Sequence, residues 1–294
     1  MSGTRALRLG LCLLLAAGSA QAQTLQWDPS WPRFRRSEVA TTFALGLVTV
    51  GAELAAPEPT SPRWSGGILL DDALRDLLRA RSLEGYERAV VASDRLFRIA
   101  LFAPLLLDVW VLSMGVHRSP DVALQLLLMN LESLAFTGSV VLVTQVLTRR
   151  ERPYVQDCGD AGGENFTACG TKRDYTSFVS GHAAVAMTSA MLMCSAHRQL
   201  ALLGGGVADA AVCVTMVGVA VGTGLLRVVS DRHYASDVVG GLAVGVISGY
   251  VLPAWLHFGF GRTPARSTGP RFTWAVSPHA ERGALGLRVS GLLP

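Results

Sequence analysis

The chain has 294 residues, of which 50% are hydrophobic and only 16% are charged. A soluble globular domain carries roughly 25% charged residues, so this composition excludes an ordinary soluble domain, and also a disordered or fibrous chain. The formal net charge is +4, but the basic residues, all arginine except Lys172, are scattered and form no run interleaved with aromatic residues. This pattern argues against a nucleic-acid-binding protein and favours a multi-pass membrane protein.

Residues 1–22 are typical of a secretory signal peptide. Arg5 and Arg8 precede the apolar stretch 9–17, and residues 20–22 offer small side chains for cleavage. The alternative is an uncleaved N-terminal anchor.

Six apolar segments follow along the chain, at residues 39–56, 96–116, 122–147, 183–196, 200–226 and 238–258. Several of them reach the roughly 20 residues that a helix needs to cross about 30 Å of hydrocarbon. The first segment is short and holds Glu53, and the fourth is short unless the helix continues through Gly181 and His197. The sequence therefore predicts an all-α, polytopic membrane bundle of about six helices.

The segments divide the chain into an N-terminal part and a core. Residues 23–95 contain the first apolar segment and a stretch, 68–83, whose leucines recur at helical spacing among charged residues. That stretch predicts a surface helix on the bilayer or on the bundle, with a solvated helix of no particular role as the alternative. Residues 96–258 form the predicted core bundle, and residues 259–294 form a C-terminal tail with no assigned purpose.

Three carboxylates, Asp108, Glu132 and Asp209, lie inside apolar segments. A carboxylate is costly there unless it is paired, protonated or facing a wet interior. None of the three segments holds a second carboxylate or a histidine, so we expect each carboxylate to hydrogen-bond a neighbouring helix and not to relay protons.

Three polar clusters interrupt the apolar pattern, each at the end of a segment: residues 145–153, 177–182 and 227–237. If the helices alternate in direction, all three clusters lie at the same face of the membrane. They would then form one pocket at the start of the fourth helix, which offers backbone N–H groups to an anion. The pocket would contain Arg152, Ser180, His182, Arg227, His233 and Asp237.

These residue types suit phosphoryl chemistry. Two guanidiniums can bind a phosphoryl group in bidentate fashion, and Ser180 and Gly181 add neutral donors and close backbone approach. Of two histidines, one can attack phosphorus while the other protonates the leaving oxygen. Asp237 follows His233 by four residues, so we expect its carboxylate to accept the ring N–H of His233 and leave the other nitrogen free to attack. His182 is then the proton donor.

Each cluster alone has a plainer explanation. An arginine and a proline at a helix end can be an interfacial anchor and a stop, Ser-Gly-His can be a simple helix start, and His233 with Asp237 can be a structural pair. The order of the clusters and their shared face favour the functional interpretation.

Arg152-Pro153, Ser180-Gly181-His182, and Arg227 followed at fixed spacing by His233 and Asp237 resemble the three-part signature of the type 2 phosphatidic acid phosphatase superfamily, over roughly residues 96–258. Its members are metal-independent phosphatases of lipid phosphates and lipid pyrophosphates, together with soluble acid phosphatases and vanadium haloperoxidases. The resemblance implies a phosphohistidine on His233 oriented by Asp237, leaving-group protonation by His182, and phosphate binding by Arg152, Ser180, Gly181 and Arg227. It implies no cofactor and no metal.

The first motif departs from the family pattern, because Gln145 stands where the family has lysine. Arg149 lies four residues after Gln145 and three before Arg152, so on a continuous helix the three share a stripe. We therefore hypothesise that Arg149 supplies the missing charge to the phosphate site. Val179 and Leu226 replace the usual proline and serine, and the loss of the serine hydroxyl can reduce or alter activity.

Cysteines and topology bear on the compartment. Cys158 and Cys169 lie in the polar loop between the first two clusters, where a disulfide requires an oxidising compartment; free thiols are the alternative. Cys194 and Cys213 lie in apolar runs and are expected to be packing residues.

The membrane topology is open to two interpretations. Six crossings after a cleaved signal would place the site inside. Arginines in the tail instead favour cytoplasmic termini and an exterior site. We expect a multi-pass inner-membrane protein whose site faces the periplasm or exterior.

The expected function is hydrolysis of a lipid phosphomonoester or lipid pyrophosphate at headgroup level, with membrane lipid as the other partner. The sequence does not set the oligomeric state. One alternative is a transporter or structural membrane protein with a decayed phosphatase site. A further alternative is a vanadate-dependent haloperoxidase-like enzyme.

Overall fold

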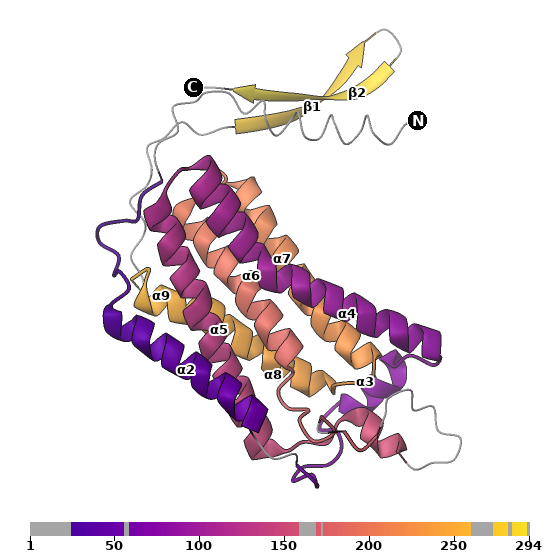
Figure 1. The fold of residues 1–294 in the computed structure, drawn as a ribbon. Helices are drawn as coiled ribbons and strands as arrows, with labels where there is room; N and C mark the ends of the chain where they lie inside the picture. Colours follow the sequence, from indigo (N-terminus) through magenta and orange to yellow (C-terminus); the bar gives the residue numbers. More distant parts are fainter. Residues whose placement is uncertain are drawn as a thin grey trace, which may run out of the picture.

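The computed structural model describes residues 25–55, 59–158, 169–171, 173–259, 273–281 and 284–292. The predicted N-terminal signal or anchor lies outside the described residues, as do the tail arginines Arg262, Arg266 and Arg271. Within them the chain forms a helical bundle, which confirms the predicted fold class (Figure 1). The long helical segments are α2 (Arg36–Ala55), α4 (Leu83–Ala103) continued by η1 (Pro104–Val116), α5 (Pro120–Thr148), α6 (Gly181–Leu200), α7 (Val207–Val229), and α8 (Ala235–Val246) continued by η3 (Ile247–Val251) and α9 (Leu252–Leu256).

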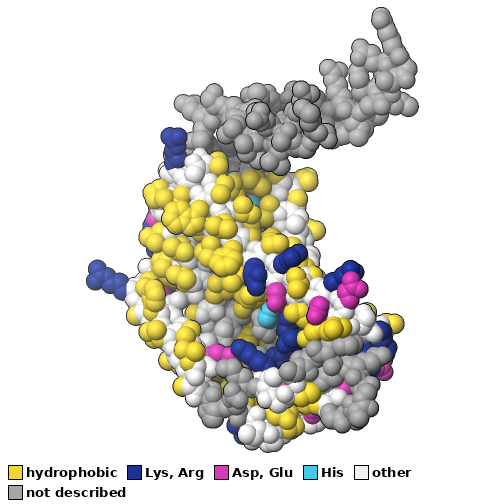
Figure 2. Space-filling view, turned by 45° about the vertical axis from the view of Figure 1, so that its right-hand side comes forward, with side chains coloured by type: hydrophobic (Ala, Val, Ile, Leu, Met, Phe, Trp, Pro, Cys, Tyr) yellow, Lys and Arg dark blue, Asp and Glu magenta, His cyan; other side chains and the backbone are white. Residues whose placement is uncertain are grey.

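Five of these segments are long and apolar enough to cross a membrane, and α6 is the exception. Large apolar side chains such as Leu47, Trp110 and Trp255 are exposed on the bundle, and apolar side chains cover much of the face shown in Figure 2. A surface of this kind is stable against lipid and unfavourable in water. The chain is therefore a multi-pass membrane protein.

Two predicted boundaries were wrong. The second apolar segment was predicted to begin at residue 96, but it belongs to a helix that begins at Leu83 and includes the charged residues before 96. The fifth begins at Val207, because Gly204, Gly205 and Gly206 adopt positive φ angles and form the turn after α6. The fourth does continue through Gly181 and His197, as its length required.

Helix α6 is the centre of the bundle and packs against α4, α5, α7 and α8. Small residues permit this: Ala183, Ala184 and Ala190 are fully buried on α6. A Cβ added at Gly241 of α8 would lie 2.5 Å from the carbonyl oxygen of Ser180, so only glycine allows the two backbones to approach so closely. This contact holds the start of α8 against the start of α6.

The predicted surface helix is shorter than expected. It forms α3 (Asp71–Leu78), which packs on the bundle beside α7 and α8 (Figure 1). Arg75 is buried and pairs with Asp231 at 2.7 Å and with Asp157 at 2.7 Å. The helix therefore fastens the loops at this end of the bundle.

The buried carboxylates have partners on neighbouring elements, as expected. Glu132 binds His257 at 2.6 Å, and His197 of α6 lies between Asp209 at 2.6 Å and Asp108 at 3.1 Å. The histidine partners thus lie outside the apolar segments that hold the carboxylates: His197 is in α6, and His257 follows α9.

Two disulfides form. The Cys158–Cys169 bond was predicted, whereas Cys194 and Cys213, expected to be packing residues, form a second bond between α6 and α7. Their Cα atoms lie 4.5 Å apart because the tight turn after α6 sets the two helices side by side.

The tail contains an antiparallel hairpin of β1 (Thr273–Glu281) and β2 (Ala284–Leu292), which was not predicted from the sequence.

Candidate active site

The three polar clusters meet at one end of the bundle, where α5 ends, α6 and α8 begin, and α7 ends. A cavity of about 690 Å³ lies there, and six of the predicted residues line it: Gln145, Arg152, Gly181, His182, Arg227 and His233. In Figure 2, basic and acidic side chains gather with a histidine around a hollow below the apolar surface. The alternating directions of the helices thus bring distant segments together, as the sequence predicted.

The pocket is strongly cationic. Arg98, Arg173 and Arg232 line it in addition to Arg152 and Arg227, against the carboxylates Glu53 and Asp94. Arg173 pairs with Glu53 at 3.0 Å, and Arg232 donates to the Tyr86 hydroxyl at 2.7 Å. The sequence analysis missed these arginines because they lie outside the motif spacing.

Arg152 is held by backbone carbonyls. Its guanidinium donates to the carbonyl oxygens of Arg173 at 2.7 Å, Arg232 at 3.1 Å and Thr176 at 3.3 Å. Burial, together with the positive charges of Arg227, Arg232 and Arg173, lowers the pKa of Arg152 well below its usual value. An anion in the pocket would relieve this repulsion.

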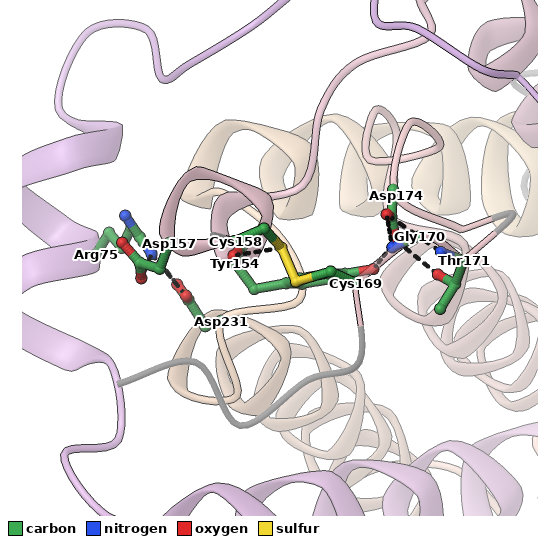
Figure 3. The surroundings of a disulfide bond; sticks show 9 residues. All are labelled: Arg75, Tyr154, Asp157, Cys158, Cys169, Gly170, Thr171, Asp174 and Asp231. Atoms are coloured by element: carbon green, nitrogen blue, oxygen red, sulfur yellow. Dashed lines mark hydrogen bonds and ion pairs between the residues drawn. A yellow bond between two sulfur atoms is a disulfide. The ribbon is translucent and has the colours of Figure 1, made fainter. Parts of the chain in front are cut away.

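The loop that holds Arg152 is fastened by the Cys158–Cys169 disulfide (Figure 3). Just after Cys169, Gly170 donates its N–H to the Asp174 carboxylate at 2.8 Å, and the Tyr154 hydroxyl donates to the same carboxylate at 2.8 Å. The Asp174 carbonyl accepts the N–H of Arg152 at 2.8 Å. The disulfide therefore stabilises the loop that positions this guanidinium.

Two buried polar atoms beside the pocket have no hydrogen-bond partner among the described residues, namely the Ser180 Oγ and the Arg227 Nε. Buried polar groups are ordinarily paired, so an unpaired nitrogen on Arg227, which lines the pocket, is available to a polar ligand. Ser180 itself does not line the pocket among the described residues. Ser180 directly precedes α6, and the Gly181 start of that helix lines the pocket. These features fit an oxyanion site.

His233 is buried and neutral. Its Nδ1 donates to the carbonyl oxygen of Ser177 at 2.9 Å, which leaves Nε2 as the free nitrogen. Burial, together with the charges of Arg152 and Arg227, lowers the pKa of His233 to about 3. At neutral pH the ring is therefore available as a nucleophile.

Asp237 does not accept the ring N–H of His233 as expected, because its Oδ2 lies 3.7 Å from Nδ1. His233 precedes α8 and Asp237 lies in its first turn, so the two do not share one helical turn. The carboxylate instead accepts bonds from the Tyr234 N–H at 2.9 Å, the Ser177 hydroxyl at 2.6 Å and Arg150 at 2.6 Å. Ser177 thus lies between the two: its hydroxyl donates to Asp237, and its carbonyl oxygen accepts the ring N–H of His233.

The premise for Arg149 was also wrong. Helix α5 ends at Thr148, and Arg149 adopts a left-handed conformation with φ 42°, so no continuous helix joins Gln145 to Arg152. Arg149 does not line the pocket among the described residues. Gln145 is buried and donates to the Val179 carbonyl at 3.1 Å. The additional charge in the pocket comes from Arg173 and Arg232.

His182 lies at the second position of α6 with its side chain partly exposed to the pocket. Its Nε2 lies 3.3 Å from the Asp94 Oδ1, and its ring packs on Phe97 with centroids 4.6 Å apart. Asp94 also lies 3.5 Å from the Arg227 Nη1. The sequence analysis missed Asp94, which is far from His182 along the chain.

These observations define a polytopic helical membrane protein with two histidines in a cationic pocket at one end of its bundle. Residues 126–260 match the model of the PAP2 superfamily, and all three motifs lie within this range. No curated protein matches the chain. Among solved structures, it is similar to one described as the first transmembrane PAP2-type phosphatidylglycerolphosphate phosphatase from Bacillus subtilis, with 18% identity and a TM-score of 0.46, covering 74% of this chain and 95% of that chain.

Proposed function

We propose that the protein is a metal-independent phosphatase that hydrolyses a lipid phosphomonoester or a lipid pyrophosphate through a phosphohistidine on His233. The observation that carries this proposal is the convergence of His233, His182, Arg152 and Arg227 on one pocket. A neutral imidazole with one free nitrogen beside two guanidiniums is what nucleophilic attack on a phosphate requires.

In the first half of the reaction, the His233 Nε2 forms a bond to phosphorus and the bond between phosphorus and the lipid oxygen breaks. The proton on His182 goes to that oxygen, so the lipid leaves as an alcohol or, from a pyrophosphate, as a monophosphate. The Ser177 carbonyl holds the Nδ1 proton of His233 at 2.9 Å and stabilises the charge that develops on the ring.

In the second half, a water molecule attacks the phosphohistidine. His182, now neutral, takes a proton from the water, the bond between nitrogen and phosphorus breaks, and inorganic phosphate leaves. Arg152, Arg227, the Ser180 hydroxyl and the start of α6 stabilise the charge on the equatorial oxygens in both halves.

A lipid substrate is supported by the walls of the pocket. Val50 and Leu54 of α2, Val90 and Phe97 of α4, and Leu142 of α5 line it together with the arginines. A headgroup can therefore reach the arginines while its tail contacts apolar side chains. Phosphatidate, phosphatidylglycerophosphate and polyprenyl pyrophosphate all satisfy this description.

We further propose that the protein lies in the inner membrane with its site facing the periplasm. The Cys158–Cys169 disulfide at the site end supports an oxidising compartment. Trp27 and Trp31 pack on Phe258, so the segments before α2 and after α9 lie together away from the site. In this orientation both segments are cytoplasmic.

The test is phosphate release from dioctanoyl phosphatidate by the purified protein in detergent micelles. We expect His233→Ala to abolish release and His117→Gln, at the far end of the bundle, to leave it unchanged. Rapid quenching with a ³²P-labelled substrate should trap an acid-labile, alkali-stable phosphoprotein in the wild type. Equal release by the wild type and His233→Ala would refute the proposal.

A further inference from the structure

Asp94 is a carboxylate in a pocket that otherwise gathers guanidiniums. It projects from α4, its side chain is 39% exposed, and its Oδ1 lies 3.3 Å from the His182 Nε2 and 3.5 Å from the Arg227 Nη1. A negative charge at this place repels a phosphate substrate. Its presence therefore calls for an explanation beyond the binding of phosphate.

The ion pair with Arg227 accounts for only part of the geometry. The same Asp94 oxygen also contacts the His182 ring nitrogen, and Phe97, one helical turn from Asp94 on α4, packs against the same imidazole ring. The helix thus contacts His182 twice, once at a ring nitrogen and once at the ring face. Two contacts of this kind fix both the orientation and the protonation of a histidine.

The electrostatic surroundings of His182 explain why a carboxylate is needed. A general acid must carry a proton when the leaving oxygen departs, but nearby positive charges oppose protonation of an imidazole. Helix α5 presents the neutral Gln145 at this place. The charged or titratable groups that line the same pocket are Asp94 and Arg98 from α4, Glu53 from α2, Arg152 and Arg173 from the loop after α5, Arg227 from α7, and Arg232 and His233 before α8.

We infer that Asp94 is a positioning residue for His182: it accepts the Nε2–H and favours the protonated imidazole against the opposing effects of burial and Arg227, so that the Nδ1–H is delivered to the leaving oxygen. This inference rests on the proposed phosphatase function. When the bond between phosphorus and the lipid oxygen breaks, the Nδ1 proton moves to that oxygen and His182 becomes neutral with its remaining proton on Nε2. When water attacks the phosphohistidine, Nδ1 takes the water proton, and Asp94 stabilises the imidazolium that forms again.

The leaving group provides the sharpest test, because an alkoxide needs a proton and p-nitrophenolate does not. For dioctanoyl phosphatidate, we expect Asp94→Asn to lower kcat/KM, which reports the half-reaction in which the leaving oxygen departs, by about 10- to 100-fold. This is less than the roughly 10²- to 10⁴-fold contribution of a general acid, because His182 itself remains. For p-nitrophenyl phosphate, we expect kcat/KM to change by less than about threefold. A structural defect would lower both rates to the same extent.

Two further readouts accompany the leaving-group comparison. KM for phosphatidate should stay the same or fall in Asp94→Asn, since the variant removes a negative charge from a phosphate site. The loss of kcat at high pH, where His182 loses its proton, should move to lower pH because the carboxylate no longer stabilises the protonated ring. A structural role would shift neither in this way.

The control variants separate the explanations. His182→Asn should show the same dependence on the leaving group. The double variant Asp94→Asn/His182→Asn should be no slower than His182→Asn alone. Asp94→Glu should recover part of the activity that Asp94→Asn loses. Glu87→Gln removes an exposed carboxylate from the same helix and should change nothing. Binding of inorganic phosphate, measured by thermal shift, verifies that Asp94→Asn is folded.

Two outcomes have different meanings. Equal loss on both substrates by a folded Asp94→Asn, or full activity on phosphatidate, would overturn the role of Asp94 and leave the proposed phosphatase intact. A wild type that hydrolyses neither substrate would refute the phosphatase, and the inference with it.

Discussion

Replacement of Arg150 is the most severe change that we predict outside the pocket. The side chain is completely buried and bridges two buried carboxylates, Asp71 at 2.8 Å and Asp237 at 2.6 Å. Its guanidinium also lies 4.0 Å from the centroid of the Trp64 ring and 4.2 Å from that of Tyr234. It therefore connects α3, the loop after α5 and the first turn of α8.

The expected magnitude follows from what Arg150→Ala leaves behind. Removal of one member of a buried ion pair costs about 3–5 kcal/mol, because the remaining charge is uncompensated. Here two carboxylates lose their cation, although Asp71 keeps hydrogen bonds from Ser236. A loss of about 4 kcal/mol corresponds to a fall in Tm of about 10 °C for a chain of this size.

Thermal unfolding in detergent measures this effect, and the neighbouring arginine is a matched control. Arg149→Ala removes a partly exposed side chain and should change the free energy of unfolding by less than about 0.5 kcal/mol. Arg150→Lys should recover only part of the stability, since an ammonium cannot form the same forked contacts. Equal Tm values for Arg149→Ala and Arg150→Ala would refute the reasoning.

A double-mutant cycle identifies the cause. Burial alone would raise the pKa of Asp71, but hydrogen bonds from Ser236, the Ile68 N–H and Arg150 lower it below its ordinary value. In the Arg150→Ala background, Asp71→Asn replaces the uncompensated charge with a neutral amide. The double variant should therefore lose less stability than the sum of the two single variants.

Three further predictions concern the site and its scaffold. The pKa of His233 is about 3 in the folded protein and 6.5 as its ordinary value, so the unfolded chain takes up the proton first as the pH falls. The contribution of His233 to stability should therefore be complete above pH 6.5 and fall by up to about 1.4 kcal/mol per pH unit below it. His233→Gln should remove this part of the pH dependence of Tm. Replacing Cys158 and Cys169 by serine should cost about 2–4 kcal/mol and weaken the binding of vanadate, measured by inhibition, because the loop that holds Arg152, the proposed phosphate ligand, is released. Gly245→Val should destabilise the bundle by about 1–3 kcal/mol, since its Cβ would lie 2.7 Å from a backbone oxygen of α6, whereas Gly218→Val points into open space and should have little effect on Tm.

The sequence predicted the architecture well because hydropathy and alternation are strong constraints in a membrane. Apolar segments must form helices there, since lipid offers no hydrogen bonds to the backbone. Successive helices that each cross the membrane must alternate in direction, which brings Arg152, His182 and His233 to one end. No structural detail was needed for that step.

The errors lie where local backbone geometry overrides spacing. Asp237 follows His233 by four residues, but the helix begins between them, and a carboxylate in a first helical turn binds nearby N–H groups. Arg149 failed for a similar reason, because a left-handed residue ends α5 and turns the following side chain, Arg150, into the protein. Sequence spacing contains no information on where a helix stops unless a glycine or proline marks it.

Asp94 illustrates a different limit. It lies just before the second apolar segment and outside all three polar clusters, and only the packing of α4 against α6 and α7 brings it to His182 and Arg227. Contacts between helices far apart in the chain depend on how each helix is rotated about its axis. That rotation follows from close packing along the whole bundle, which one motif does not determine.

The positive charges that line the pocket explain why its geometry has to be held by groups outside it. Arg152, Arg227 and the neighbouring arginines repel one another, and they would move apart if only their own side chains fixed them. Backbone carbonyls hold Arg152, Tyr86 holds Arg232, and the Asp237 carboxylate, itself bound by Arg150, holds Ser177 against His233. The fold thus holds the arginines in place against their mutual repulsion. In the proposed function, a phosphate can then bind them without any rearrangement of their side chains.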